Sequence, residues 1–166
     1  MTSVRNGTDR DLERVVAIKV RTWSDTYGPL IAPEVLRPFL DQAAQLAYLR
    51  EKTRSANTIL LVAEDHGVVG FALTFLDHGP DPWLESLHVH PDSQSRGVGT
   101  LLLRATASEL KARGRNSMGL GVVDGNTAAE RFYERLGAVD AGREPTSWAE
   151  GVMHHLYRWP TLEGLT

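Results

Sequence analysis

The chain has 166 residues and an apolar fraction of 42%, so we expect one globular domain over residues 1–166. It contains no cysteine, which excludes disulfide bridges and thiol catalysis. Its formal net charge of −3 argues against general nucleic-acid binding, which needs a basic face, and is compatible with a cationic or amine substrate.

The N-terminal half of the chain alternates between strand and helix signals. A helix is expected between Thr8 and Gly28, because apolar residues repeat there at helical spacing and Gly28-Pro29 ends the pattern. Further helical segments are expected at residues 33–36 and 41–54, and strands at residues 4–6, 59–63 and 68–75. The last two strands are joined by a short turn and therefore predict an antiparallel hairpin.

The C-terminal half contains the strand, loop and helix around which the rest of the chain is arranged. Strands are expected at residues 83–89, 118–123, 138–139 and 152–157, and helices at residues 100–113 and 126–136. These elements predict an α/β fold: a mixed, mostly antiparallel sheet of about seven strands with helices on both faces. The strands at 83–89 and 118–123 should form one parallel central pair, joined by a right-handed crossover.

Residues 94–100, Gln-Ser-Arg-Gly-Val-Gly-Thr, form a glycine-rich loop between the predicted strand and helix. Gly97 and Gly99 let the backbone approach a ligand with no Cβ in between. The backbone N–H groups of such a loop and the positive end of the next helix favour an anion, and Arg96 adds a charge-assisted contact. A phosphate or pyrophosphate is therefore predicted, and the alternative is an ordinary glycine-rich turn.

This loop does not match the two common nucleotide-binding motifs. A Walker loop would need a Gly-Lys-Ser/Thr sequence, which is absent. A dinucleotide fingerprint would need a third glycine at the position that Leu102 occupies. A stand-alone nucleotide-binding domain is therefore disfavoured.

The loop instead resembles the pyrophosphate loop of the GNAT acetyltransferases, whose motif is Gln-x-x-Gly-x-Gly between a strand and a helix. Residues 126–138 resemble the second motif of that family, Asn-x-x-Ala-x-x-x-Tyr-x-x-x-Gly-Phe, with Ala138 in place of the final aromatic residue. The resemblance extends from Val4 to about Tyr157 and implies the GNAT fold and an acetyl-CoA-dependent N-acetyltransferase. Acetyl-CoA would be a co-substrate, and no metal is expected.

The resemblance also implies which residues hold acetyl-CoA. They are Leu87, His88, Val89, Gln94, Ser95, Arg96, Gly97, Val98, Gly99, Thr100, Asn126, Ala129 and Tyr133. The strand backbone would pair with the pantetheine amides, and the Val89 N–H would polarise the acetyl carbonyl. The two parallel strands would splay apart to admit the pantetheine arm, which the sequence spacing alone does not show. Asn126 is either only a helix N-cap or also a partner of that arm.

Acetyl transfer also needs groups that move protons. Tyr133, at the tyrosine position of the family, is the candidate general acid for the leaving thiolate, since a phenol with a pKa of about 10 stays protonated at neutral pH. The alternative is a packed aromatic residue beside Phe132. His88 and His90 lie two residues apart, but no other ligand cluster accompanies them, so a metal site is disfavoured.

Glu85 is the candidate general base. Strand alternation is expected to place Trp83, Glu85, Leu87 and Val89 on one face, and Leu84, Ser86 and His88 on the other. A carboxylate among apolar neighbours on a central strand is unusual and indicates a functional role. The role expected here is to accept the amine proton, directly or through water. The alternative is a solvent-facing or salt-bridged glutamate.

The expected function is direct transfer of an acetyl group from acetyl-CoA to a primary amine of a small molecule or peptide. The alternative is a CoA-binding regulatory or sensor domain without turnover. Candidate walls for the amine site are residues 23–31, 77–82 and 143–150, which carry both apolar and acidic side chains. Many members of the family dimerise through their C-terminal strands, and the sequence leaves open whether this chain forms a homodimer.

The sequence gives no sign of membrane attachment. No apolar run reaches the roughly eighteen residues of a membrane span, and the N-terminus lacks the apolar core of a signal peptide. We therefore expect a cytoplasmic protein with no membrane partner.

Overall fold

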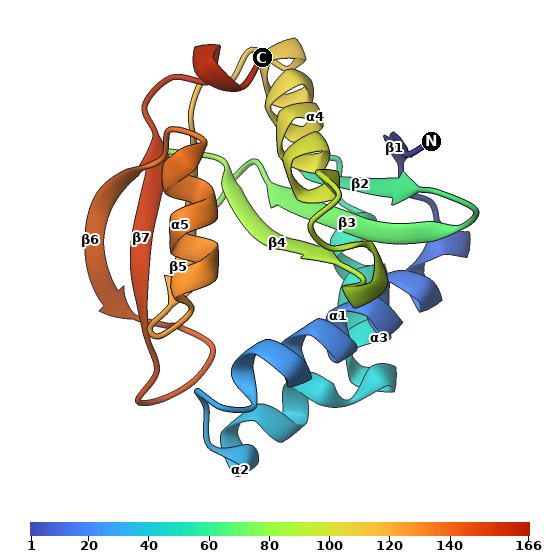
Figure 1. Ribbon diagram of the computed structural model, residues 1–166, viewed down its shortest axis with the longest axis vertical. Coiled ribbons are helices and arrows are strands. Elements are labelled where there is room, and N and C mark those ends of the chain that lie inside the picture. The colour runs from blue at the N-terminus through green and yellow to red at the C-terminus, as the bar shows by residue number, and fades with distance from the viewer.

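A seven-stranded sheet runs through the molecule in the order β1-β2-β3-β4-β5-β7-β6 (Figure 1). The computed structural model describes residues 1–166. Its strands are β1 Ser3–Asn6, β2 Thr58–Glu64, β3 Val68–Phe75, β4 Trp83–Val89, β5 Met118–Val123, β6 Val139–Pro145 and β7 Met153–Trp159. Only β4 and β5 are parallel neighbours, and all other pairs are antiparallel. The predicted mixed sheet with one parallel pair is therefore confirmed.

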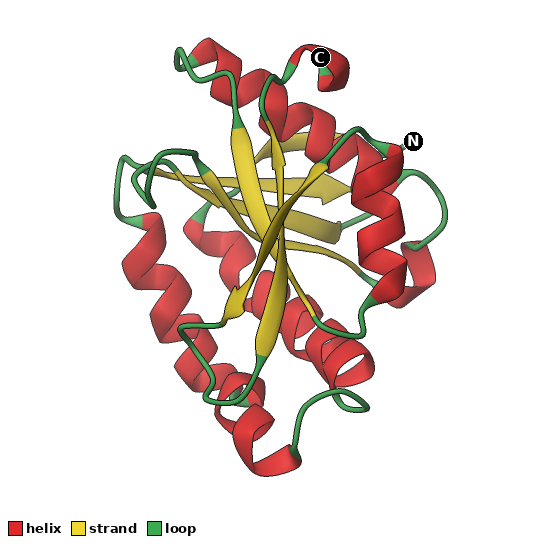
Figure 2. Ribbon diagram, turned by 90° about the vertical axis from the view of Figure 1, so that its left-hand side faces the viewer, coloured by secondary structure: helices red, strands yellow, loops and turns green.

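Helices cover both faces of this sheet, as predicted (Figure 2). They are α1 Leu12–Tyr27, α2 Pro33–Leu36, α3 Gln42–Thr53, α4 Val98–Ala112 and α5 Thr127–Arg135. On one face, Leu12 and Ile18 of α1 and Leu49 of α3 form a core with Phe71 of β3. On the other face, α4 and α5 form a larger core with the sheet. None of these helices has the length and apolar character needed to cross a lipid bilayer.

The two parallel strands touch at one end only. Trp83 pairs with Gly119, and the Gly119 N–H donates to the Pro82 carbonyl at 2.8 Å, but no further residue of β4 pairs with β5. Toward their carboxyl ends the strands therefore diverge, and the backbone of β4 facing β5 is left without a strand partner. This is the splay that the resemblance implied, and it opens the middle of the sheet.

Most predicted boundaries lie within two residues of the observed ones, and two differences have a structural reason. The helix after the glycine-rich loop begins at Val98 rather than at residue 100, because Gly97 adopts a left-handed conformation and acts as the N-cap. The strand expected at residues 138–139 extends as β6 to Pro145. Every residue of β6 is exposed, so this edge strand shows none of the apolar alternation by which a strand is recognised in a sequence.

Candidate active site

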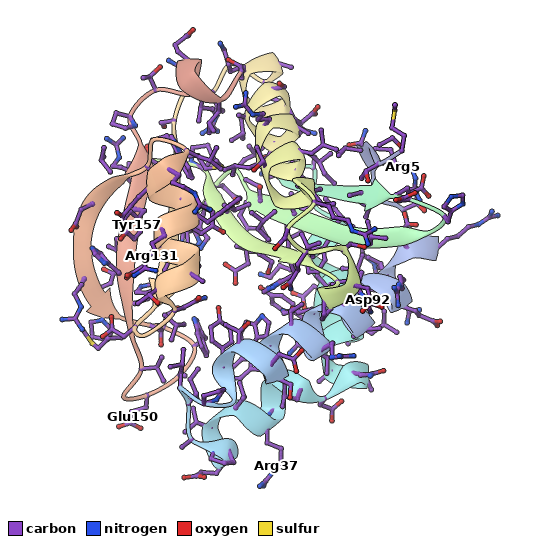
Figure 3. All side chains as sticks on the ribbon, in the orientation of Figure 1. Arg5, Arg37, Asp92, Arg131, Glu150 and Tyr157 are labelled. Atoms are coloured by element: carbon purple, nitrogen blue, oxygen red, sulfur yellow. The ribbon has the colours of Figure 1, made fainter.

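A cavity of about 590 Å³ lies between the diverging strands and the N-terminal ends of α4 and α5. All the residues predicted to hold the cofactor line it, except Arg96, whose side chain is exposed on the loop. In Figure 3, side chains from α1, β4 and α5 converge on this region, with Asp92 marking the turn after β4 and Arg131 marking α5. The structure thus brings the strand, the loop and the second motif together at one place.

The edge of β4 that faces the cavity presents free backbone groups. The His90 N–H donates to the Val69 carbonyl of β3 at 2.7 Å. Because successive residues of a strand direct their hydrogen-bonding groups to opposite edges, the N–H groups of Val89 and Leu87 point away from β3, toward β5. No strand pairs with them there, so this edge can accept an extended ligand as an added strand would bind.

The loop after β4 is shaped for an anion. Ser95 and Gly97 both adopt left-handed conformations, with φ of +65° and +79°. No side chain caps the N-terminus of α4, so the first amides of this helix have no partner within it. No atom lies within 4 Å of the position that a Cβ on Gly97 would occupy. Amides at a helix N-terminus, open to a cavity, suit a phosphate group.

Two polar side chains of the motifs form hydrogen bonds with the protein backbone. The Gln94 side-chain amide donates to the Val89 carbonyl at 3.0 Å, which ties the loop back to the end of β4. The Asn126 carbonyl oxygen accepts from the Ala129 N–H at 3.3 Å, so Asn126 is the N-cap of α5. Both residues therefore hold the walls of the cavity in place, whatever further contact they make with a ligand.

Tyr133 is a buried residue of the cavity lining. Its ring is 9% exposed and packs edge-on against Phe132 and Trp159. Burial, with the nearby Tyr27, raises the pKa of the Tyr133 hydroxyl, and no protein group forms a hydrogen bond with this hydroxyl. A phenol in this setting stays protonated at neutral pH and has a free proton to donate.

The predicted facing of Glu85 relative to its neighbours on β4 was wrong. Thr74 of β3 pairs with Leu84 and Leu73 pairs with Ser86, so Glu85 is the extra residue of a β-bulge. The bulge shifts the alternation, and Leu87 and Val89 contact the core beneath α4 and α5. Glu85 instead faces the side of α1 and α3, where Lys19 and Lys52 influence its carboxyl. His88 lies on the same side, since it accepts a hydrogen bond from Trp23 of α1.

The surroundings of Glu85 favour a proton acceptor of raised basicity. Burial raises the pKa of its carboxyl, and the nearby Lys19 lowers it in part. The Trp83 indole N–H donates to its Oε2 atom at 3.1 Å, which orients the carboxyl group. No salt bridge holds Glu85, so the alternative of a salt-bridged glutamate does not apply.

Lys19 is a buried charge that the sequence interpretation missed. Its ammonium donates to Gln45 Oε1 at 2.7 Å, and it lies over the rings of Trp23 and Tyr48 at 5.3 and 5.2 Å. Burial lowers its pKa to about 8, opposed by the Glu85 carboxylate. The sequence does carry a signal for this residue. A lysine on the apolar face of a helix predicts a buried charge that has a partner, since lysine is rarely buried without one.

The histidine pair does not share one site. The Trp23 indole N–H donates to Nε2 of His88 at 3.1 Å, and burial lowers the pKa of His88 to about 3. His88 is therefore neutral and its Nε2 is already occupied. His90 lies at the start of the next turn, where its Nδ1 accepts from the Asp92 N–H at 3.1 Å.

A second cavity, of about 940 Å³, opens on the other side of Glu85. Members of all three predicted acceptor walls line it, together with residues of α3 that the sequence interpretation missed. Its lining includes Trp23, Tyr27, Tyr48, Lys52, Asp77, His78, Asp81, Glu144 and Trp148. No motif marks the α3 residues, because only the packing of α3 against α1 and β2 brings them here.

The two cavities meet at Glu85. The residues that line both are Trp23, Tyr27, Leu84, Glu85 and Gly121. A carboxylate thus stands where the cavity lined by the glycine-rich loop joins the cavity lined by α1, α3 and the loop between β6 and β7. Two ligands entering from the two sides would meet beside it.

The sequence and the fold are similar to those of known acetyltransferases. Residues 18–138 match the family described as the acetyltransferase (GNAT) family. The chain is 27% identical over 128 residues to an uncharacterised N-acetyltransferase of Mycobacterium tuberculosis, covering 76% of this chain and 82% of that protein. It is 28% identical over 149 residues to an L-methionine sulfoximine/L-methionine sulfone acetyltransferase of Pseudomonas aeruginosa, covering 86% and 83%.

A solved structure shows the same fold. It is the PaiA N-acetyltransferase of Thermoplasma acidophilum in complex with coenzyme A, with a TM-score of 0.75. The match covers 95% of this chain and 98% of that one at 18% sequence identity. At this identity the likeness concerns the fold alone.

Proposed function

The chain belongs to the GNAT family of acetyltransferases and is an acyltransferase, and from this premise we propose that it transfers the acetyl group of acetyl-CoA directly to a primary amine of a small molecule or peptide. The observation that carries this proposal is the junction of the two cavities at Glu85. It gives the acetyl donor and the amine separate entrances and one meeting point. The relative from Pseudomonas aeruginosa, named for small amino-acid derivatives, supports a small-molecule acceptor.

The residues of the first cavity fit acetyl-CoA. The uncapped N-terminus of α4 and the open space at Gly97 suit the diphosphate, with the first amides of α4 as donors. The unpaired edge of β4 suits the amides of the pantetheine arm, which can bond to it as an extended strand does. Arg96, an exposed residue of the loop, would add positive charge near the diphosphate.

The reaction then uses three groups of the protein. The amine nitrogen attacks the thioester carbon and forms the C–N bond, while the Val89 N–H stabilises the charge on the carbonyl oxygen. Glu85, deprotonated, takes the proton that the amine loses, directly or through water. The C–S bond breaks as Tyr133 gives its proton to the leaving thiolate, and the phenolate regains a proton from solvent. The products are an N-acetylated amine and free CoA.

An acceptor screen tests this proposal. Thiol release from acetyl-CoA should rise with at least one of four classes: amino acids, polyamines, amino sugars and peptides, and mass spectrometry should find the product heavier by one acetyl group. Tight binding of acetyl-CoA with no amine-dependent release across all four classes would instead favour the sensor domain without turnover.

Blocking the phosphate cradle should weaken acetyl-CoA binding. Gly97→Val places a branched side chain where the diphosphate is proposed to lie. We expect the affinity measured by calorimetric titration to fall about tenfold or more, because a charge-assisted hydrogen bond to the diphosphate is lost. The substitution also strains the left-handed backbone at φ +79°.

A matched variant separates strain from obstruction. Gly114, at the other end of α4, has φ of +78° and likewise no atom within 4 Å of an added Cβ. Gly114→Val should therefore cost similar stability in thermal melting and leave the affinity for acetyl-CoA unchanged. If both variants bind acetyl-CoA with equal affinity, the glycine-rich loop is not part of the binding site.

A further inference from the structure

The charges that line the acceptor cavity are mostly paired with one another. Arg158 donates two hydrogen bonds to the Asp81 carboxylate, both at 3.0 Å. Glu144 lies 3.3 Å from the His154 imidazole. His78 stacks on the Trp83 ring at 4.8 Å between centroids. These groups shape the walls, but they have little charge left to offer a substrate.

Lys52 is different, because it is a cation of this cavity with no acidic partner. No carboxylate lies within 4.0 Å of its ammonium group, whereas Arg158, the other lysine or arginine in the lining, is paired. The Lys52 ammonium lies 5.6 Å from the ring centroids of both Tyr48 and Phe75. Two aromatic rings hold it in place without using its hydrogen-bond donors, so these remain for an anion.

Lys52 and Glu85 form a complementary pair of binding groups. Both line the same cavity, and they are near enough that the charge of Lys52 lowers the pKa of the Glu85 carboxyl. An amine that carries a carboxylate on the same carbon presents opposite charges a few bonds apart. Such a molecule has one group of each charge to offer to this pair.

The rest of the cavity wall selects for an uncharged side chain. Trp23, Tyr27 and Trp148 line it, and Trp23 packs against the ring of Trp148 with 5.2 Å between centroids. The acidic Asp77 also faces the cavity, but it is exposed and accepts from Asn57 at 3.4 Å, so solvent screens it. An aromatic wall packs against apolar and polarisable groups. An anionic side chain would find no partner there, and a cationic one would meet the repulsion of Lys52 and of Lys19, which lies over the Trp23 ring.

We propose that Lys52 binds the carboxylate of the acceptor, and that the acceptors of this enzyme are α-amino acids with uncharged side chains. This inference rests on the proposed acetyl transfer and narrows it to a substrate class. Lys52 is a substrate-binding residue here, and it takes no part in proton transfer.

Three ligands that differ at the carboxyl group test the inference. A panel of L-amino acids is assayed first, and the best one is compared with its α-amide and with the amine that lacks the carboxyl group. The unmodified enzyme should prefer the amino acid in kcat/KM. Lys52→Met should lower kcat/KM for the amino acid by about 10- to 100-fold, mainly through KM, because a charge-assisted contact is lost. The same variant should affect the amide and the amine much less, since they share only the small effect of Lys52 on the pKa of the Glu85 carboxyl.

Two further variants serve as controls. Lys52→Arg keeps the positive charge and should recover part of the preference. Lys111→Met removes a lysine that pairs with Glu163 at 3.3 Å, outside both cavities, and should change nothing.

Several outcomes would overturn the inference while leaving the acetyl transfer intact. One is an equal loss for all three ligands in Lys52→Met. Another is an unmodified enzyme that prefers the amine without a carboxylate, or a diamine that would use Asp77 or Glu144. Absence of turnover with every amine would instead overturn the transferase proposal, and this inference with it.

Discussion

Replacing Glu85 with glutamine is expected to lower the amine-dependent rate by about 10²–10⁴ at neutral pH, the usual contribution of a general base. The affinity for acetyl-CoA should hardly change, because Glu85 lies where the two cavities join and is not part of the glycine-rich loop proposed to hold the diphosphate. Glutamine keeps the shape of the side chain and an oxygen for the Trp83 indole N–H. The lost rate is therefore attributable to the lost basic oxygen.

The unmodified enzyme and Glu85→Gln should also differ in how their activity depends on pH. Burial raises the pKa of the Glu85 carboxyl, and only the deprotonated form accepts a proton. The activity of the unmodified enzyme should therefore fall as the pH drops through this raised pKa. Glu85→Gln should lack that fall, and its deficit should shrink at high pH, where the amine is already neutral.

A matched variant controls for the general effect of removing a negative charge from the cavity. Glu144 lines the same acceptor cavity but is paired with His154. Glu144→Gln should keep a rate close to that of the unmodified enzyme, with at most a small change in KM. If Glu85→Gln matches it at neutral pH, then Glu85 has a structural role and water accepts the amine proton.

Removing the Tyr133 hydroxyl is expected to lower kcat and kcat/KM together by about 10²-fold, which corresponds to about 2.7 kcal/mol of barrier. The reason is that sulfur gains negative charge only as the C–S bond breaks, so a proton donor there acts in the transition state and not in ground-state binding. The KM for acetyl-CoA should stay nearly the same.

The fold should tolerate this substitution. Tyr133→Phe keeps the ring contacts with Phe132 and Trp159, and the hydroxyl has no protein partner that would be left unpaired. Thermal melting should confirm an unchanged fold. An acetyl thioester whose thiol has a lower pKa should recover part of the lost rate, since a better leaving group needs less help.

Three results are distinguishable for this variant. A rise in the KM for acetyl-CoA alone would make Tyr133 a binding contact. A lower melting temperature with proportionate loss of activity would make it a core aromatic residue, as its packing also permits. An unchanged rate would leave protonation of the thiolate to solvent.

The sequence alone was sufficient to predict the fold class and the family, because their signals are local. Residues 94–100 combine two close glycines with a preceding strand and a following helix, and these features are set by neighbouring residues. Asn126 is the N-cap of the short helix that carries Tyr133, so the spacing of the two residues is set by that helix. The parallel pairing of β4 with β5 follows from the crossover between them.

Only the tertiary structure decided how the candidate site is assembled. The facing of Glu85 depends on its register with β3, where a bulge shifts the side-chain alternation of β4. The divergence of β4 from β5 depends on long-range packing, as does the position of Lys52, which α3 brings against Phe75 at the end of β3. Contacts between segments far apart in the chain leave no periodic mark in a sequence, so these features emerge only when the segments pack.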